Sequence, residues 1–320
     1  MHSLRLEEPI DRKFNMKTVL FGGSGFLGRH IIPKLSAADH TLTLVTRRVV
    51  DVRRIVPASM EVRTWDDPKG ITSIIDGSDA VVNLCGESIG AKRWTAGRKE
   101  KILSSRVETT KKIVDAIGQA SSRPSVLLNA SAVGYYGNVE TGDVSEDHPP
   151  GNDFLANVCV RWEEEAKKAE RLGVRVVLQR SGVVLAKDGE AFRRMVLPFK
   201  MFVGGTLGSG TQWFPWIHID DEIGAMMHLL EHQSISGPVN LVAPGSVTMK
   251  QYCSALGNAM RHPSWAPVPS FVLRIALGEM ADTLVLSGQK AVSRKLTGSG
   301  YQFRQPAIGN ALAEIVRLYA

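Results

Sequence analysis

The chain has 320 residues, of which 43% are hydrophobic and 22% are charged, so it is long enough for one large globular domain or two small ones. This composition excludes a collagen, a coiled-coil rod and a chain disordered throughout. No run of about 18 apolar residues could span a bilayer, and the N-terminus lacks the apolar stretch of a secretory signal. Three scattered cysteines suit neither a disulfide framework nor a zinc site. We therefore expect a cytoplasmic protein that holds no metal.

The net charge of +7 is concentrated in two stretches. Residues 92–112 hold eight Lys/Arg and two Glu, and residues 286–304 hold four basic residues and no acid. Such an excess favours an anionic ligand, nucleic acid included, although a solvated helix face and a loop would give the same counts. Because no nucleic-acid-binding motif accompanies the charge, we expect a small-molecule substrate of unknown identity, and neither nucleic acid nor a membrane as partner.

Strands and helices are expected to alternate through residue 185. Residues 1–15 have no clear period and are interpreted as a flexible leader. Short apolar and β-branched runs predict strands at residues 17–21, 41–45, 62–65, 79–84, 125–129 and 175–178. Apolar stripes at helical spacing predict helices over residues 26–35, 101–117 and 155–169. This alternation indicates a parallel sheet with right-handed crossovers.

The pattern changes after residue 185. Residues 187–211 are rich in Gly and basic side chains, and residues 213–221 are aromatic and strand-like. A helix over 222–232 and a strand at 239–242 follow, and the last 70 residues are mostly helical. We predict an α/β protein: a Rossmann-type, doubly wound parallel sheet domain of residues 16–185, to which 217–243 return, and a smaller, mostly helical substrate lobe of 186–216 and 244–320.

A glycine-rich loop lies between the first expected strand and the first expected helix. Gly22, Gly25 and Gly28 have the spacing in which the first glycine permits a tight turn, the second admits a pyrophosphate, and the third lets the helix pack on the sheet. The start of the helix then offers free N–H groups to the phosphates. The residues expected to contact a dinucleotide here are Gly22, Ser24, Gly25, Phe26, Leu27 and Gly28.

The end of the second expected strand indicates which dinucleotide is bound. An NAD site usually carries an acidic residue there for the ribose 2′-hydroxyl, but this chain has Arg47 and Arg48. Guanidinium groups can pair with a 2′-phosphate, whereas an acid would repel it. We therefore predict NADP(H) as the cofactor. Two exposed arginines on a turn are the alternative interpretation.

Several further motifs resemble one enzyme family. They are the glycine loop, Val82 to Gly86, Ser131 to Gly137, Arg180 to Leu185 and Trp216 to Asp221. From about Lys17 to the C-terminus, the chain resembles an extended short-chain dehydrogenase/reductase of the nucleotide-sugar epimerase kind. More narrowly, it resembles the atypical subgroup labelled as epimerases or as cell-division inhibitors.

The resemblance implies a set of site residues. The family's catalytic set is Ser, Tyr, Lys and Asn, and Ser131 matches the serine. The Tyr-x-x-x-Lys motif is absent, because the start of the expected helix reads Phe154-Leu155-Ala156-Asn157-Val158-Cys159. By resemblance to the atypical subgroup, Cys159 takes the place of the lysine and Arg106 that of the asparagine. The implied cofactor contacts after the fourth strand are Leu84, Cys85, Gly86 and Glu87, together with Arg106.

Each of these residues also has a structural interpretation. Cys159 could act as a thiolate acid/base or be a small core residue. Arg106 lies at the edge of an apolar stripe, from which it could hold an anionic group. Tyr135 could donate a proton in place of the missing tyrosine, or it could pack against the nicotinamide pocket, and the same holds for Tyr136. His218, Asp220 and Asp221 could suggest metal ligands, but a structural role at the lobe junction is favoured.

Two functions remain open from the sequence. The first is an NADP(H)-dependent epimerase or reductase of a small polar substrate, nucleotide-linked or acidic, in which the cofactor carries the hydride. The second is a non-catalytic NADPH sensor that regulates a partner, which the missing Tyr and Lys suggest. Either protein could be a monomer or a homodimer.

Overall fold

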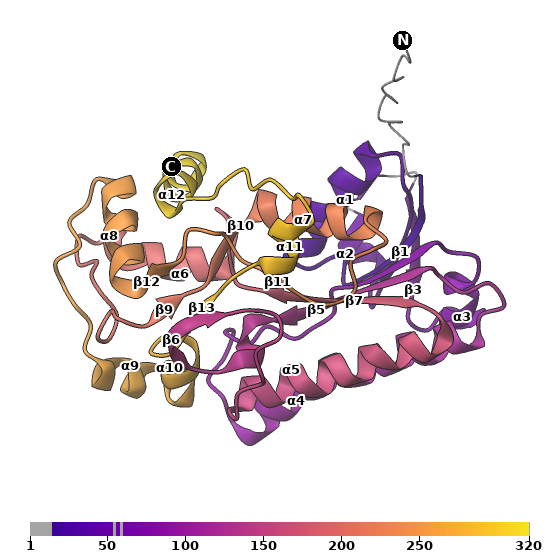
Figure 1. The fold of residues 1–320 in the computed structure, drawn as a ribbon, viewed down its shortest axis with the longest axis horizontal. Helices are drawn as coiled ribbons and strands as arrows, with labels where there is room; N and C mark the ends of the chain where they lie inside the picture. Colours follow the sequence, from indigo (N-terminus) through magenta and orange to yellow (C-terminus); the bar gives the residue numbers. More distant parts are fainter. Residues whose placement is uncertain (1–14, 54–55, 58–59, 320) are drawn as a thin grey trace, which may run out of the picture.

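A seven-stranded parallel sheet forms the centre of the molecule (Figure 1). The computed structural model describes residues 15–53, 56–57 and 60–319, so the expected leader, apart from Asn15, lies outside the described residues. The strand order is β11-β7-β5-β4-β1-β2-β3. The strands are β1 (Lys17–Phe21), β2 (Thr41–Thr46), β3 (Glu61–Thr64), β4 (Ala80–Asn83), β5 (Val126–Ala132), β7 (Arg175–Ser181) and β11 (Gly237–Leu241). The predicted Rossmann-type sheet is therefore confirmed.

Helices cover both faces of this sheet. On one face lie α1 (Phe26–Ala37), α2 (Val49–Arg53) and α7 (Ile219–Glu231), and on the other lie α3 (Gly70–Ile75), α4 (Ala96–Gln119) and α5 (Phe154–Lys167) (Figure 1). Two short 3-10 helices, η1 (Val133–Tyr136) and η2 (Lys168–Leu172), follow β5 and α5. Such two-sided cover explains why the central strands read as near-continuous apolar runs.

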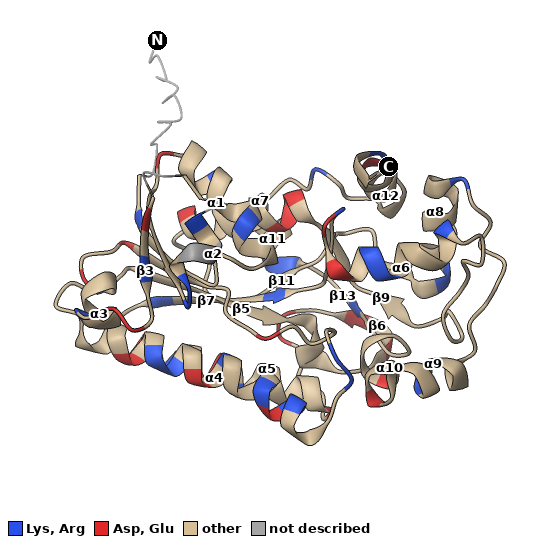
Figure 2. Cartoon of the chain, turned by 180° about the vertical axis from the view of Figure 1, so that it is seen from behind, with Lys and Arg blue, Asp and Glu red and all other residues tan. Residues whose placement is uncertain are grey.

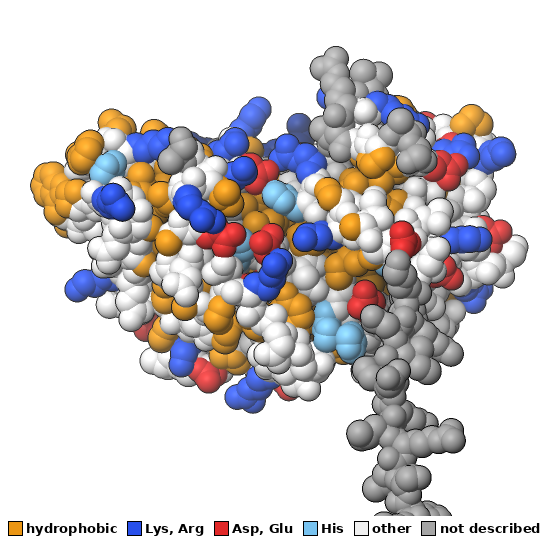
Figure 3. Space-filling model, turned by 90° about the horizontal axis from the view of Figure 1, so that it is seen from above, with side chains coloured by type: hydrophobic (Ala, Val, Ile, Leu, Met, Phe, Trp, Pro, Cys, Tyr) orange, Lys and Arg blue, Asp and Glu red, His pale blue; other side chains and the backbone are white. Residues whose placement is uncertain are grey.

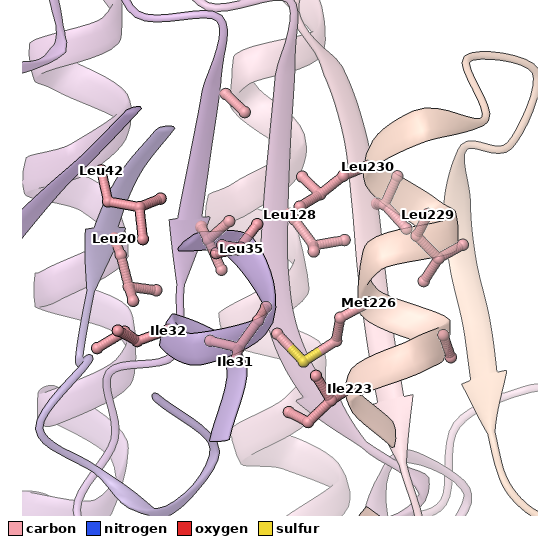
Figure 4. Packing of buried hydrophobic residues seen from close by; sticks show 14 of the residues in the cluster. Leu20, Ile31, Ile32, Leu35, Leu42, Leu128, Ile223, Met226, Leu229 and Leu230 are labelled. Atoms are coloured by element: carbon pink, nitrogen blue, oxygen red, sulfur yellow. The ribbon is translucent and has the colours of Figure 1, made fainter. Parts of the chain in front are cut away.

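The sheet carries a separate apolar core on each face. Leu20, Val82 and Leu128 pack toward α1 and α7, whose Ile31, Leu35 and Met226 meet them (Figure 4). Val19, Val81 and Leu127, one position earlier in each strand, pack toward α4 instead. Neighbouring strand residues point to opposite faces, so the same short runs supply both cores.

The remaining elements build a smaller lobe beside the carboxyl ends of the strands. We use the name small lobe for residues 186–216 and 244–320, the boundaries predicted above. Its helices are α6 (Glu190–Lys200), α8 (Met249–Met260), α9 (Ser270–Leu277), α10 (Glu279–Leu284) and α12 (Ile308–Tyr319). The short helix α11 (Arg294–Gly298) falls within these residues but packs against β11, and its Leu296 joins the core of the sheet. Short strands pair in twos: β8 (Val183–Leu185) with β10 (Trp216–His218), β9 (Trp213–Phe214) with β12 (Val247–Thr248), and β6 (Val139–Val144) with β13 (Gln289–Ala291). The small lobe has a core of its own, centred on Phe192, Trp216, Tyr252 and Leu312.

The structure differs from the expected elements where the chain returns to the sheet. Residues 213–221 were expected to be strand-like, but α7 begins at Ile219. The side chain of His218 accepts a hydrogen bond from the backbone N–H of Asp220 and caps this helix. With this histidine cap, the helix begins three residues before its expected start at Glu222.

Candidate functional site

The glycine loop turns sharply between β1 and α1. Gly22 has φ +82°, and a Cβ built on it would lie 2.8 Å from the carbonyl carbon of Leu84. A Cβ on Gly28 would lie 2.4 Å from the Cα of Gly23. A side chain at either position would collide with backbone, so both glycines are required for the close approach of this loop to β4 and of α1 to the loop.

The start of α1 offers an anion site. Its N-cap residue, Gly25, supplies no side-chain cap, and its first turn contains no acidic residue. The backbone N–H groups of Phe26, Leu27 and Gly28 therefore lie at a positive helix end without a capping side chain. This is the arrangement that binds phosphate groups in proteins.

The loop after β4 forms the opposite side of the site. Asn83, fully buried at the end of β4, accepts a hydrogen bond from the Cys85 N–H at 3.1 Å and donates to Asn129 Oδ1 at 2.7 Å. Sequence reasoning missed Asn83 and Asn129 as site-building residues, although a polar residue that ends an apolar strand was visible as a signal. Their bond links the end of β4 to the middle of β5 and fixes the backbone that leads to Gly86.

Arg106 lies against this loop. A Cβ on Gly86 would be 3.0 Å from the Arg106 guanidinium carbon, which also stands 5.1 Å from the centre of the Trp162 ring. The guanidinium donates to the carbonyl of Ile102 at 2.9 Å. Burial lowers the pKa of Arg106, and the neighbouring Cys159 and Glu87 oppose that shift. The structure thus places Arg106 beside Gly86 and close enough to Cys159 for their charges to interact.

Further charged residues lie beside the loop after β4. Glu87 pairs with Arg98 at 2.7 Å, and this hydrogen bond lowers the pKa of its carboxyl group. Arg47 and Arg48 are exposed at the end of β2, and the positive charge of Arg47 reaches Cys85 and Glu87. Arg47 therefore stands near the loop after β4. We use the word groove for the boundary between this loop (Leu84–Glu87) and the glycine loop (Gly22–Gly28).

Cys159 is buried in α5. Burial, and then the negative charge of Glu163, raise the pKa of its thiol to about 12. A thiol with that pKa is protonated at neutral pH and is a poor acid/base group. The structure therefore favours the interpretation of Cys159 as a small core residue beside Arg106.

The hydroxyl of Ser131 is engaged by a buried ion pair. Ser131 Oγ donates to Glu163 Oε1 at 2.7 Å, and the same carboxylate binds Arg180 through two hydrogen bonds of 2.8 Å. All three residues are at most 5% exposed. Sequence reasoning missed Glu163 as a partner, although it follows Cys159 by four residues on the buried face of α5.

The two tyrosines of η1 have different surroundings. Tyr136 is buried, donates its hydroxyl to Asn240 Oδ1 at 2.6 Å and accepts from Arg180, and burial raises its pKa to about 12. Tyr135 is only half-buried, and its ring lies under the Arg180 guanidinium at 3.5 Å from the ring centre. The hydroxyl of Tyr136 is held in the core by two hydrogen bonds, whereas the hydroxyl of the half-buried Tyr135 has no hydrogen-bond partner among the described residues.

A short segment of the small lobe joins both sides of the groove. Asp188 binds His30 of α1 at 3.1 Å, and a Cβ on Gly189 would touch the Phe26 ring at 3.4 Å. Glu190 accepts from Ser88 of the β4 loop at 2.9 Å. We call residues 188–190 the strap, because they connect the first turns of α1 to the loop after β4.

The candidate metal ligands have structural roles. Asp221 is fully buried and accepts hydrogen bonds from the backbone N–H groups of Arg304 and Gln305. Among the described residues, no group of three or more His, Cys, Asp or Glu side chains is placed to hold a metal ion. Over the same residues, no helix combines the length and the apolarity that a bilayer crossing requires.

Comparisons with known proteins agree with this arrangement. Residues 18–241 match the NAD dependent epimerase/dehydratase family, and residues 268–315 match a domain of unknown function, DUF1731. The chain belongs to the NAD dependent epimerase/dehydratase family. This membership bears out the resemblance seen in the sequence.

Relatives within this family extend over nearly the whole chain. The chain is 41% identical to an epimerase family protein SDR39U1 homolog, chloroplastic, of Arabidopsis thaliana, over 96% of this chain and 88% of that one. Human epimerase family protein SDR39U1, crystallised with NADPH, is 35% identical with a TM-score of 0.85, over 94% of this chain and 99% of that one. MoeE5 in complex with UDP-glucuronic acid and NAD has a TM-score of 0.74 at 18% identity, over 95% of this chain and 100% of that one, and supports the fold alone.

Proposed function

We propose that this chain is an NADP(H)-dependent epimerase or reductase of a small polar substrate, nucleotide-linked or acidic. The observation that carries the proposal is the likeness to the human relative, whose structure holds NADPH, combined with the open helix start at Gly25. Arg47 supports the phosphorylated form of the cofactor, because its guanidinium stands beside the groove where an acid would repel a 2′-phosphate.

The residues present fit a dinucleotide. The backbone of Gly22 lies so close to that of Leu84 that a Cβ would collide with it, which keeps side chains out of the glycine loop, and the uncapped amides of α1 match a pyrophosphate. Gly22 to Gly28 would hold the pyrophosphate, Leu84 to Glu87 would flank it, and Arg47 with Arg48 would hold the 2′-phosphate. When bound, NADP(H) supplies hydride transfer.

The protein must then orient the substrate and manage a proton. Tyr135 is the best-placed phenol, because Tyr136 and the Cys159 thiol are buried with raised pKa values and Ser131 already donates to Glu163. The Arg180 cation over its ring fixes the orientation of Tyr135. Arg106 is the cation closest to the loop at Gly86 and would hold an anionic group of the substrate or cofactor.

A hydride-transfer assay tests the proposal. Purified protein loaded with 4-deuterated NADPH is incubated with a panel of carbonyl compounds, including nucleotide-linked keto sugars, and deuterium in the alcohol products is measured. In parallel, protein loaded with NADP+ is incubated with nucleotide sugars, and epimerised product is measured. We expect transfer that Tyr135→Phe lowers at least about tenfold, in line with the usual contribution of a positioned proton donor, while Cys159→Ala retains it. An absence of transfer to every compound, or unchanged transfer by Tyr135→Phe, would contradict this role.

A second function is favoured by one observation. Leu155 and Cys159 stand where the family carries Tyr and Lys, and the Cys159 thiol is buried and protonated. This favours a protein that binds NADPH without turnover and reports it to a partner. It would bind NADPH tightly, transfer no hydride to any cell metabolite, and bind its partner only when NADPH is present, which a pull-down with and without NADPH would detect.

A further inference from the structure

Exposed apolar side chains gather at one end of the small lobe. Nine large hydrophobic residues of the described chain are strongly exposed, and eight of them fall between Leu197 and Ile275. We call these eight the apolar end: Leu197, Met201, Phe202, Val203, Trp265, Phe271, Val272 and Ile275. Figure 3 shows apolar side chains crowded at the left-hand tip of the molecule. Contiguous exposed apolar surface of this kind marks an interaction site.

The segments that carry these residues are joined to one another. Trp265 Nε1 donates to the carbonyl of Phe202 at 2.9 Å, and residues 204–206 pair with 265–268 through backbone hydrogen bonds. The chain then enters α9 at Ser270. The loop at 201–203, Trp265 and α9 therefore form one connected surface.

Local structure holds the apolar side chains outward. Phe202 has φ +60°, a left-handed conformation that is unusual for a bulky residue, and its ring is 57% exposed. None of the residues of α9 is buried, and Ile275 in this helix is 72% exposed. These residues add little to the core of the fold, so their exposed apolar surface indicates binding to an external partner.

Charge identifies the kind of partner. Residues 191–219 and 232–278, which carry the apolar end, contain six Lys/Arg and no Asp or Glu. Two of the six, Arg194 and Arg274, form ion pairs with Glu190 and Asp282 just outside these ranges, so four basic residues contribute most of the positive charge. Figure 2 shows basic residues on α6, α8 and α9 in this region. A second copy of the chain docked on the same surface would bring like charges together, whereas an anionic surface would be attracted.

We propose that the apolar end binds peripherally to the surface of an anionic lipid bilayer. Trp, Phe and Met tips flanked by Lys and Arg suit the boundary between headgroups and acyl chains. Side chains more than half exposed on three separate segments would each need a pocket on a protein partner, but they enter a fluid interface without one. The sequence-based expectation of no membrane partner rested on the lack of a spanning segment, which peripheral binding does not require.

Vesicle sedimentation tests this inference independently of the proposed catalytic function. Full-length protein is mixed with phosphatidylcholine vesicles that contain or lack phosphatidylglycerol. We expect partition onto the anionic vesicles that weakens with added salt, and the variant Phe202→Asn/Trp265→Ser/Ile275→Ser should partition at least about tenfold less. Leu318→Ser, which removes an apolar side chain of similar exposure (51%) on α12, is the matched control. Unchanged NADPH binding by all variants shows that they are folded.

Four outcomes would overturn the inference. They are equal partition of the triple variant and wild type, equal binding to neutral and anionic vesicles, and the absence of any vesicle binding. The fourth is self-association in vesicle-free buffer that the triple variant abolishes, which would assign the surface to a second copy.

Discussion

Arg47 is the residue that should decide between the two forms of the cofactor. It is exposed at the end of β2, and its charge reaches Cys85 and Glu87 across the groove. We expect Arg47→Glu to weaken NADPH binding by about 10–100-fold, the worth of one charge-assisted hydrogen bond replaced by repulsion, with little change for NADH. Titration of cofactor fluorescence measures both. Lys34→Ala, which removes an exposed charge from α1, should leave both affinities unchanged, and parallel losses for NADPH and NADH would show that Arg47 does not read the 2′-phosphate.

Glu222 is the residue whose protonation should make stability depend on pH. It is fully buried in α7, Oε1 accepts from Ser181 at 2.6 Å, and among the described residues Oε2 has no hydrogen-bond partner. Burial raises its pKa to about 8, against an ordinary value of 4.5. A raised carboxyl pKa means that the folded state keeps a proton that the unfolded state releases, so stability is lost as pH rises from 4.5 to 8.

The substitution Glu222→Gln should remove this dependence. It keeps an acceptor for Ser181 and carries no titrating proton, so its stability relative to wild type should increase by on the order of 3 kcal/mol between pH 5 and pH 8. Urea unfolding of both proteins at a series of pH values measures the difference. A difference that stays constant over this range would mean that Glu222 is ionised in the folded protein.

Buried ionic residues were the hardest to assign from the sequence. Arg180 and Glu163 are 2% and 1% exposed, yet charged residues are almost never fully buried unless they are paired. Pairing is a property of the fold, because the two residues come from β7 and α5. The glycine loop, in contrast, was predictable because its glycines follow a fixed spacing along the chain.

At the scale of elements, the strap should control how fast the cofactor leaves. Its contacts with His30 and Ser88 span the two sides of the groove. We expect Asp188→Asn/Ser88→Ala to accelerate NADPH release by about three- to tenfold, since two partly exposed contacts contribute on the order of 1 kcal/mol together. Stopped-flow loss of NADPH fluorescence during a chase with NADP+ measures the rate.

A matched variant separates this effect from a general loss of surface ion pairs. Asp143→Asn removes the pair between Asp143 and Lys290, at 2.9 Å and partly exposed, far from the strap in sequence. Its release rate should equal that of wild type. If the strap variant also released NADPH at the wild-type rate, residues 188–190 would have no part in retaining it.

Strands and helices were predicted where the sequence shows one clear hydrophobic pattern. Most strands of the central sheet contain continuous apolar runs, and all seven were found within a few residues, although β3 (Glu61–Thr64) is only partly buried. β6 was not found, because Val139–Val144 is mostly polar and exposed. Its strand conformation is set by pairing with β13 from a segment some 150 residues away, and such long-range pairing leaves no local pattern.

At the scale of the whole molecule, the C-terminal region is part of the same structural unit as the sheet. Gln289 donates to the carbonyl of Val133 at 2.6 Å, beside η1, and Tyr301 donates to the carbonyl of Asp221 at 3.1 Å. Residues 268–315, which match a domain of unknown function, therefore pack against the end of β5 and the start of α7.

The Asp221 carboxylate joins the start of α7 to the C-terminal region, and removing it should destabilise the whole chain. Its carboxylate accepts from the backbone N–H of Arg304 at 2.7 Å and of Gln305 at 2.8 Å. Asp221→Ala would leave both amides without their acceptor in a buried setting, which should cost about 2–4 kcal/mol of unfolding free energy. Asp220→Ala removes a neighbouring helix-start charge and should cost less than about 1 kcal/mol. Urea unfolding followed by tryptophan fluorescence compares them, and equal losses would mean that the Asp221 carboxylate does not hold the C-terminal region in place.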